Sequence, residues 1–172
     1  MPQGEDTVHR NRVPSRGSSL LAISLLVLAF GCLSAVAVPI VKRSYLSRKA
    51  ALVAADLKTF RAAFQRFAKE HGDWPDGGRP AGKIPIGMGP YLMGTHWSDT
   101  TPVGGHYQWC RNTPQAGGRY TAVIVIASTG DSAVTTRSDQ LSALEAAVGG
   151  GNLPSGSLIL GFRNFPVYVL EH

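Results

Sequence analysis

RGSSLLAISLLVLAFGCLSAVAVPIVKRSY, residues 16–45, is the stretch that decides the fold, because basic ends enclose a long apolar centre. Residues 20–41 carry no charged side chain. As a helix rising about 1.5 Å per residue, about 22 residues extend about 33 Å, enough to cross a hydrocarbon core about 30 Å thick. The length of this run therefore predicts a helix that spans a membrane.

Two other fates of the apolar stretch remain open. A secretory signal peptide has a shorter apolar region, about 7–15 residues, although residues 35–37 (AVA) match an A-x-A cleavage site. Gly31 and Cys32 resemble the end of a lipoprotein signal, but Ala29 stands where that signal has leucine. The chain also stays apolar for nine residues beyond the cysteine. These features favour a retained membrane anchor.

Beyond the apolar run, apolar residues recur at alternating steps of four and three, the spacing of one face of an amphipathic helix. The residues on this face are Leu46, Ala50, Val53, Leu57, Phe60, Phe64 and Phe67. Gly72 is a predicted C-cap, and Pro75 prevents further helix. The sequence thus predicts one helix from about Ser18 to His71, bent or loosened at Pro39, whose apolar stripe packs on the rest of the chain.

Residues 73–172 predict a small head that covers this stripe. Turn residues and β-branched runs mark its elements. The predicted elements are a loop at 73–105, a hairpin of 106–111 and 119–128 with its turn at 113–118, a helix at 138–148 capped by Ser138 or Asp139, and a final strand pair in 157–172 turning near Arg163 and Asn164. A long helix packed on an antiparallel sheet is an α+β fold.

Composition and motifs indicate little chemistry. The chain has 172 residues, and its 17 Lys and Arg against 11 Asp and Glu permit an anionic partner without specifying one. Cys32 lies inside the apolar run, so a disulfide with Cys110 is not expected. Residues 77–83 (GGRPAGK) have the spacing of a phosphate-binding loop, but Ile84 replaces its hydroxyl residue and Pro85 prevents the following helix. The sequence predicts no catalytic residue, cofactor or metal site, and hence no enzyme.

Over about 75 residues the chain resembles the type IV pilins and the type II secretion pseudopilins. Precursors in that family carry a short basic leader that ends in glycine, as residues 1–17 do at Gly17. Counting Ser18 as the first mature residue places Pro39 at position twenty-two, where the family has a proline. The stretch DLKTFRAAFQRFAKEHGDWP (residues 56–75) is similar to the end of a pseudopilin helix.

The resemblance implies processing and assembly. A prepilin peptidase would cut between Gly17 and Ser18 and methylate the new N-terminus. The implied partners are that peptidase, other pseudopilin subunits, an inner-membrane secretion platform and membrane lipid. Two positions depart from the family, since Ser18 stands in place of phenylalanine and Ala22 in place of a glutamate that aligns a subunit with its neighbour. The loss of that glutamate favours a minor subunit, with assembly resting on the helix around Ala22 and Pro39.

The predicted organisation is a basic leader at 1–17, a transmembrane segment at 18–41, an amphipathic helix at 42–72 and a periplasmic head at 73–172. Basic residues flank both ends of the span, so the positive-inside rule does not favour the orientation with the N-terminus in the cytoplasm that a pilin requires. These residues are Arg10, Arg12 and Arg16 on one side and Lys42, Arg43, Arg48 and Lys49 on the other. The predicted function is a structural subunit of a secretion or pilus-like filament in the inner membrane. The alternative is a single-span periplasmic binding module outside any filament, and a nucleic-acid partner is not expected.

Overall fold

The computed structural model describes residues 16–115, 117–149 and 158–171, with the side chains of residues 16–19, 21 and 32–37 outside this description. The chain divides into two compact units, Met1–Lys42 and Arg43–His172. Most of the predicted leader falls on residues 1–15, which lie outside the described part. The second unit contains the predicted amphipathic helix together with the predicted head.

Helix α1 comprises Arg16–His71, with Pro39 inside it. The predicted helix is therefore confirmed over residues 38–71. Its C-terminal end is formed by Gly72, which has φ +77° and donates its N–H to the carbonyl of Ala68 at 2.9 Å. Glycine adopts this left-handed conformation without a Cβ clash, so Gly72 is the predicted C-cap.

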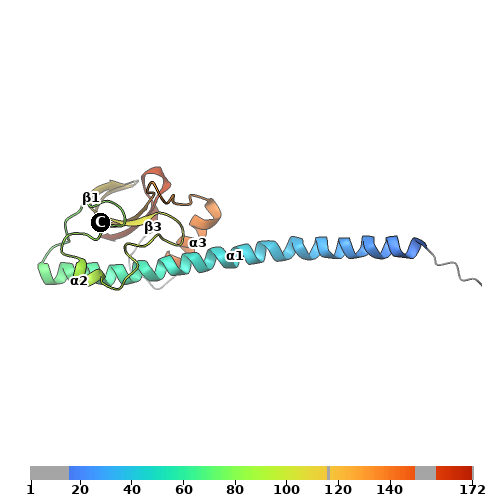
Figure 1. Ribbon diagram of the computed structural model, residues 1–172. Coiled ribbons are helices and arrows are strands. Elements are labelled where there is room, and N and C mark those ends of the chain that lie inside the picture. The colour runs from blue at the N-terminus through green and yellow to red at the C-terminus, as the bar shows by residue number, and fades with distance from the viewer. Residues whose placement is uncertain (1–15, 116, 150–157, 172) are drawn as a thin grey trace, which may run out of the picture. The chain divides into compact units, whose positions relative to one another are not determined.

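The second unit contains a four-stranded antiparallel sheet with the strand order β1-β2-β4-β3. Figure 1 shows this sheet beside the C-terminal part of α1. The strands are β1 (His106–Gln115), β2 (Gly118–Ala127), β3 (Leu158–Leu160) and β4 (Pro166–Glu171). The connections hold α2 (Gly89–Leu92), α3 (Ser138–Gly149) and a 3-10 turn at Phe162–Asn164 between β3 and β4. The predicted hairpin, short helix and final strand pair are confirmed. The hairpin turn is shorter than predicted, and α2 lies in a stretch predicted to be loop.

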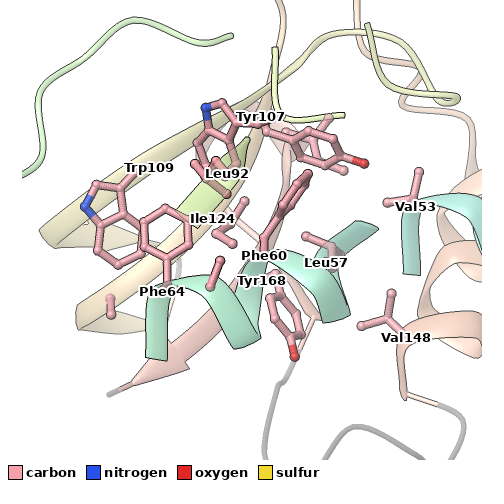
Figure 2. Close-up of a cluster of buried hydrophobic side chains, with 14 of the residues drawn as sticks. Val53, Leu57, Phe60, Phe64, Leu92, Tyr107, Trp109, Ile124, Val148 and Tyr168 are labelled. Atoms are coloured by element: carbon pink, nitrogen blue, oxygen red, sulfur yellow. The ribbon is translucent and has the colours of Figure 1, made fainter. Parts of the chain in front are cut away.

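The apolar stripe of α1 packs on one face of this sheet (Figure 2). Val53, Leu57, Phe60 and Phe64 are fully buried, and Phe67 is 9% exposed. The facing side chains come from the strands, from α2 and the loop after it, and from α3, and include Leu92, Trp97, Tyr107, Trp109, Ile124, Val148 and Tyr168. The α+β architecture, with the long helix packed on an antiparallel sheet, is confirmed for this unit.

A second apolar cluster covers the opposite face of the sheet. Its members are Tyr120, Val123, Val125, Ala127, Val167 and Val169. Strict alternation would place Tyr120 with Ala122 on the face toward α1, yet only Ala122 lies there. The register of β2 against β4 shifts between Ala122 and Val123, and Asn112 of β1 has a positive φ of 50°. Irregularities of this kind change the face that a strand presents.

The start of α3 differs from the predicted cap. Ser138 and Asp139 lie inside the helix. The N–H groups of Gln140 and Leu141 donate to the carbonyl of Arg137 at 3.1 and 3.0 Å, so Arg137 holds the N-cap position. The carboxylate of Asp139 accepts the N–H of Gln140 at 2.9 Å and thus still satisfies a donor of the first turn. The predicted N-cap is therefore wrong by one or two positions.

Candidate functional site

Large apolar side chains of α1 are exposed throughout the described part of the N-terminal unit. The consecutive residues Leu25, Leu26, Val27 and Leu28 are exposed by 70, 62, 64 and 69%. Because successive residues turn about 100° around a helix axis, four in a row cover its whole circumference. The other exposed large apolar residues of this unit are Leu20, Ile23, Phe30, Val38, Ile40 and Val41. A helix that is apolar on every side is typical of a membrane or of a bundle of apolar helices.

The predicted processing and assembly residues belong to the same segment. Gly17 and Ser18 lie in α1 with their side chains outside the described part, while Ala22 and Pro39 are exposed. Ser24 Oγ donates to the carbonyl four residues earlier at 2.9 Å, so this polar group is satisfied by its own helix. In the part of the chain that the structure describes, no helix is both long and apolar enough to traverse a bilayer.

The predicted core stripe is held by aromatic ring contacts. Phe60 meets Trp97 and Tyr107 edge-on, with ring centroids 5.0 and 4.7 Å apart. Phe64 stacks on Trp109, with centroids 4.3 Å apart and ring planes at 23°. Each such pair contributes about 0.5–1.5 kcal/mol beyond the burial of its surface. These contacts fix the second part of α1 to the sheet and to the loop that precedes it (Figure 2).

A polar junction lies beside this stripe. The hydroxyl of Tyr107 donates to Asp56 Oδ2 at 2.9 Å, and His96 Nδ1 lies 3.2 Å from Asp56 Oδ1. Burial raises the pKa of Tyr107, and the charge of Asp56 raises it further, so the phenol stays protonated and donates. One carboxylate oxygen of Asp56 thus contacts His96 in the loop after α2, and the other accepts a hydrogen bond from Tyr107 in β1. These two contacts fix the rotation of this part of α1 relative to β1.

A second polar contact fastens the chain just after α1. Arg111 of β1 donates to Asp73 Oδ2 at 2.5 Å and to the carbonyl of Trp74 at 3.0 Å. The hydrogen bond from Arg111, followed by that from the N–H of Trp74, holds the pKa of Asp73 below its ordinary value. The chain leaving α1 is therefore tied to the outer edge strand of the sheet.

A shallow groove of about 620 Å³ lies beside the C-terminal end of α1. Its polar lining residues include Arg61, Gln65, Trp74, Thr121 and Glu171. The indole N–H of Trp74 donates to the carboxylate of Glu171, and Arg61 Nη1 donates to the hydroxyl of Tyr168 at 3.4 Å. Several of these groups therefore bond within the protein. Specific small-molecule sites instead present a few convergent polar groups in a largely apolar cleft.

The remaining reactive groups do not form a catalytic arrangement in the described residues. Within residues 16–115, 117–149 and 158–171, no three His, Cys, Asp or Glu side chains come close enough to hold a metal ion. Burial raises the pKa of the Cys110 thiol, which disfavours the nucleophilic thiolate. The stretch at 77–83 is not followed by a helix, so its phosphate-loop spacing has no helix N-terminus to support it.

The polar junction around Asp56 was not predicted from the sequence. One signal was available, because Asp56 is the first acidic residue after Asp6 and follows Val53 by one helical turn beside the apolar stripe. Its partners, His96 and Tyr107, come from a loop and a strand whose positions the helix periodicity does not specify.

Comparisons of the chain with protein-family models, with curated proteins and with solved structures find no match. The pseudopilin resemblance therefore stays a hypothesis, which depends on the motifs at Gly17 and Pro39 and on the helix pattern that follows them.

Proposed function

We propose that this chain is a membrane-anchored, pseudopilin-like structural subunit of a type II secretion or type IV pilus-like filament. Its N-terminal helix would lie in the inner membrane before assembly and among neighbouring helices afterwards. The head would lie in the periplasm and form contacts with adjacent subunits. The proposed role of the chain is structural and not catalytic. Its partners are sister subunits, the processing peptidase, the secretion platform and lipid.

The observation that carries this proposal is the exposure of apolar side chains on every side of α1 among the described residues 20, 22–31 and 38–41. At about 25 cal/mol per Å² of apolar surface, leaving so many large side chains in water costs many kcal/mol. A bilayer or a helix bundle removes that cost. The proposed membrane anchor depends on the sequence of residues 20–41, which has no charged side chain.

The contact between α1 and the sheet supports the same proposal. The apolar stripe ends in a glycine cap at Gly72, and the sheet covers this stripe. The same helix therefore supplies both the base of a folded head and, in its first part, large exposed apolar side chains. The alternative, a periplasmic binding module, has the same anchor and head. The filament subunit and the binding module are therefore distinguished by experiments on processing and assembly.

Processing is tested by expressing the full chain with and without a prepilin peptidase and weighing the membrane-bound product by mass spectrometry. The expected product lacks residues 1–17 and carries a methyl group on Ser18. A Gly17→Leu variant is the matched control and should stay uncut. An intact N-terminus, a product starting at Val38, or a diacylglyceryl group on Cys32 would each contradict the proposal.

Assembly is tested with the processed chain. Ala22 removes the charge that would align a subunit with its neighbour, so the chain alone is expected to form no filament and to enter filaments only beside sister subunits. Electron microscopy of sheared fractions measures this, with Ala22→Glu as the comparison variant. Abundant filaments of the unaltered chain alone would contradict a minor-subunit role.

A further inference from the structure

A cluster of cations follows the apolar segment at the beginning of the second unit. Arg43 and Arg48 are exposed and Lys49 is partly exposed, all within seven residues of α1. At about 100° per residue, Arg48 lies about 140° and Lys49 about 240° around the helix axis from Arg43. The three cations therefore surround the helix. A charged stripe on the solvent side of an amphipathic helix would instead keep them on one face.

Within residues 16–115, 117–149 and 158–171, no carboxylate forms an ion pair with this cluster. The sequence has no Asp or Glu between Asp6 and Asp56. None of the ion pairs among the described residues involves Arg43, Arg48 or Lys49. Three neighbouring cations without an acidic partner repel one another, so an external anion stabilises them.

An amphipathic aromatic residue lies within the cluster. The ring of Tyr45 is 57% exposed, and Lys49 Nζ lies 4.7 Å from its centroid. Tyrosine is enriched where one end of a side chain meets apolar surface and the other meets water, as at the boundary of a membrane. The position of Tyr45, four residues after the apolar run, agrees with such a boundary.

The cluster is slightly longer than a lipid headgroup layer is thick. Arg43 and Lys49 are six residues apart, or about 9 Å along the helix. A bilayer about 40–45 Å thick with a hydrocarbon core of about 30 Å leaves about 5–8 Å of headgroup region on each side. A helix that leaves the core near Val41 places the Cα of Arg43 about 3 Å and that of Lys49 about 12 Å beyond the core. Arg43 then lies within the headgroup region, and the long side chains of Arg48 and Lys49 can reach back to it.

We propose that Arg43, Arg48 and Lys49 form a collar that binds the phosphate groups of anionic lipids at the membrane surface. The proposal rests on the membrane anchor of the proposed function, but neither on the filament nor on the side of the membrane that the head occupies. Cations beyond the span oppose an orientation with the N-terminus in the cytoplasm. Their attraction to anionic headgroups supplies an interaction that compensates for this opposition.

The test is native mass spectrometry of the full chain released from detergent micelles with added phosphatidylglycerol or phosphatidylcholine. The unaltered chain is expected to retain phosphatidylglycerol preferentially. Each cation near a lipid surface changes binding by roughly fivefold, so Arg43→Gln/Arg48→Gln/Lys49→Gln should lower the preference at least about tenfold. A charge-retaining variant, Arg43→Lys/Arg48→Lys/Lys49→Arg, should keep it and controls for folding.

The matched control neutralises three exposed cations elsewhere in the head, Arg79→Gln/Lys83→Gln/Arg119→Gln, and should keep the preference. The collar is refuted if the unaltered chain retains both lipids equally, if this control loses as much preference as the collar variant, or if inorganic phosphate displaces the lipid. A chain that an alkaline carbonate wash removes from membranes contradicts the anchor. An anchored chain without lipid preference contradicts the collar alone.

Discussion

Phe60→Ala is expected to lower the free energy of unfolding of the head by about 3–5 kcal/mol. Phe60 is fully buried, and the rings of Trp97 and Tyr107 meet it edge-on. Truncation loses the burial of the ring, about 1.5–3 kcal/mol, and two ring pairs of about 0.5–1.5 kcal/mol each. A domain of this size has a total stability of about 5–15 kcal/mol, so the loss is a large share of it.

The assay is guanidinium unfolding of the full chain in detergent micelles, followed by tryptophan fluorescence, because Trp97 and Trp109 are buried and report on the core. Leu52→Ala is the control on the same helix. Leu52 is 58% exposed, so its truncation should cost no more than about 0.5 kcal/mol. If both variants shift the midpoint equally at an unchanged m-value, Phe60 does not pack in the core and the helix–sheet contact is wrong.

Two further predictions concern the polar contacts of the head. Tyr107→Phe should cost about 1–3 kcal/mol, because it removes the donor 2.9 Å from the carboxylate of Asp56; an equal cost in an Asp56→Ala background, which has no acceptor, would contradict this bond. The hydrogen bond from Arg111 holds the pKa of Asp73 in the folded protein below its ordinary value of 3.8. The contact between these two residues therefore stabilises the fold fully above about pH 4, and this stabilisation is lost as the pH falls through the lower folded-state pKa. In the Asp73→Asn variant, the free energy of unfolding should therefore fall less steeply below about pH 4 than in the unaltered chain. The same steepness in both proteins would refute the contact.

The features that could be predicted from the sequence are those that depend on neighbouring residues. The stripe from Val53 to Phe67 follows helix periodicity, and that periodicity is local. The cap at Gly72 follows from the conformational freedom of glycine. The hairpin of β1 and β2 joins consecutive strands, so its pairing could also be predicted.

The features that could not be predicted depend on contacts between distant residues. Tyr120 occupies the face opposite to the one that alternation predicts, because the strands are irregular near Asn112 and Ala122. In the candidate site, too, local features could be predicted and contacts between distant residues could not. The apolar segment and the cations after it are visible in the sequence, whereas the bonds of His96 and Tyr107 to Asp56 exist only after a loop and a strand come together.

The strand order has a consequence for the timing of synthesis. β4 is the C-terminal strand of the described sheet, yet it lies between β2 and β3, and β3 pairs with β4. Arg61 of α1 is 107 residues away from its contact Tyr168 in β4. At about 5–20 residues per second, a ribosome takes roughly 5–20 s to bridge that separation. The apolar stripe of α1 is thus only partly covered, by β1 and β2, until β4 is synthesised, and the nascent head exposes apolar surface throughout this interval.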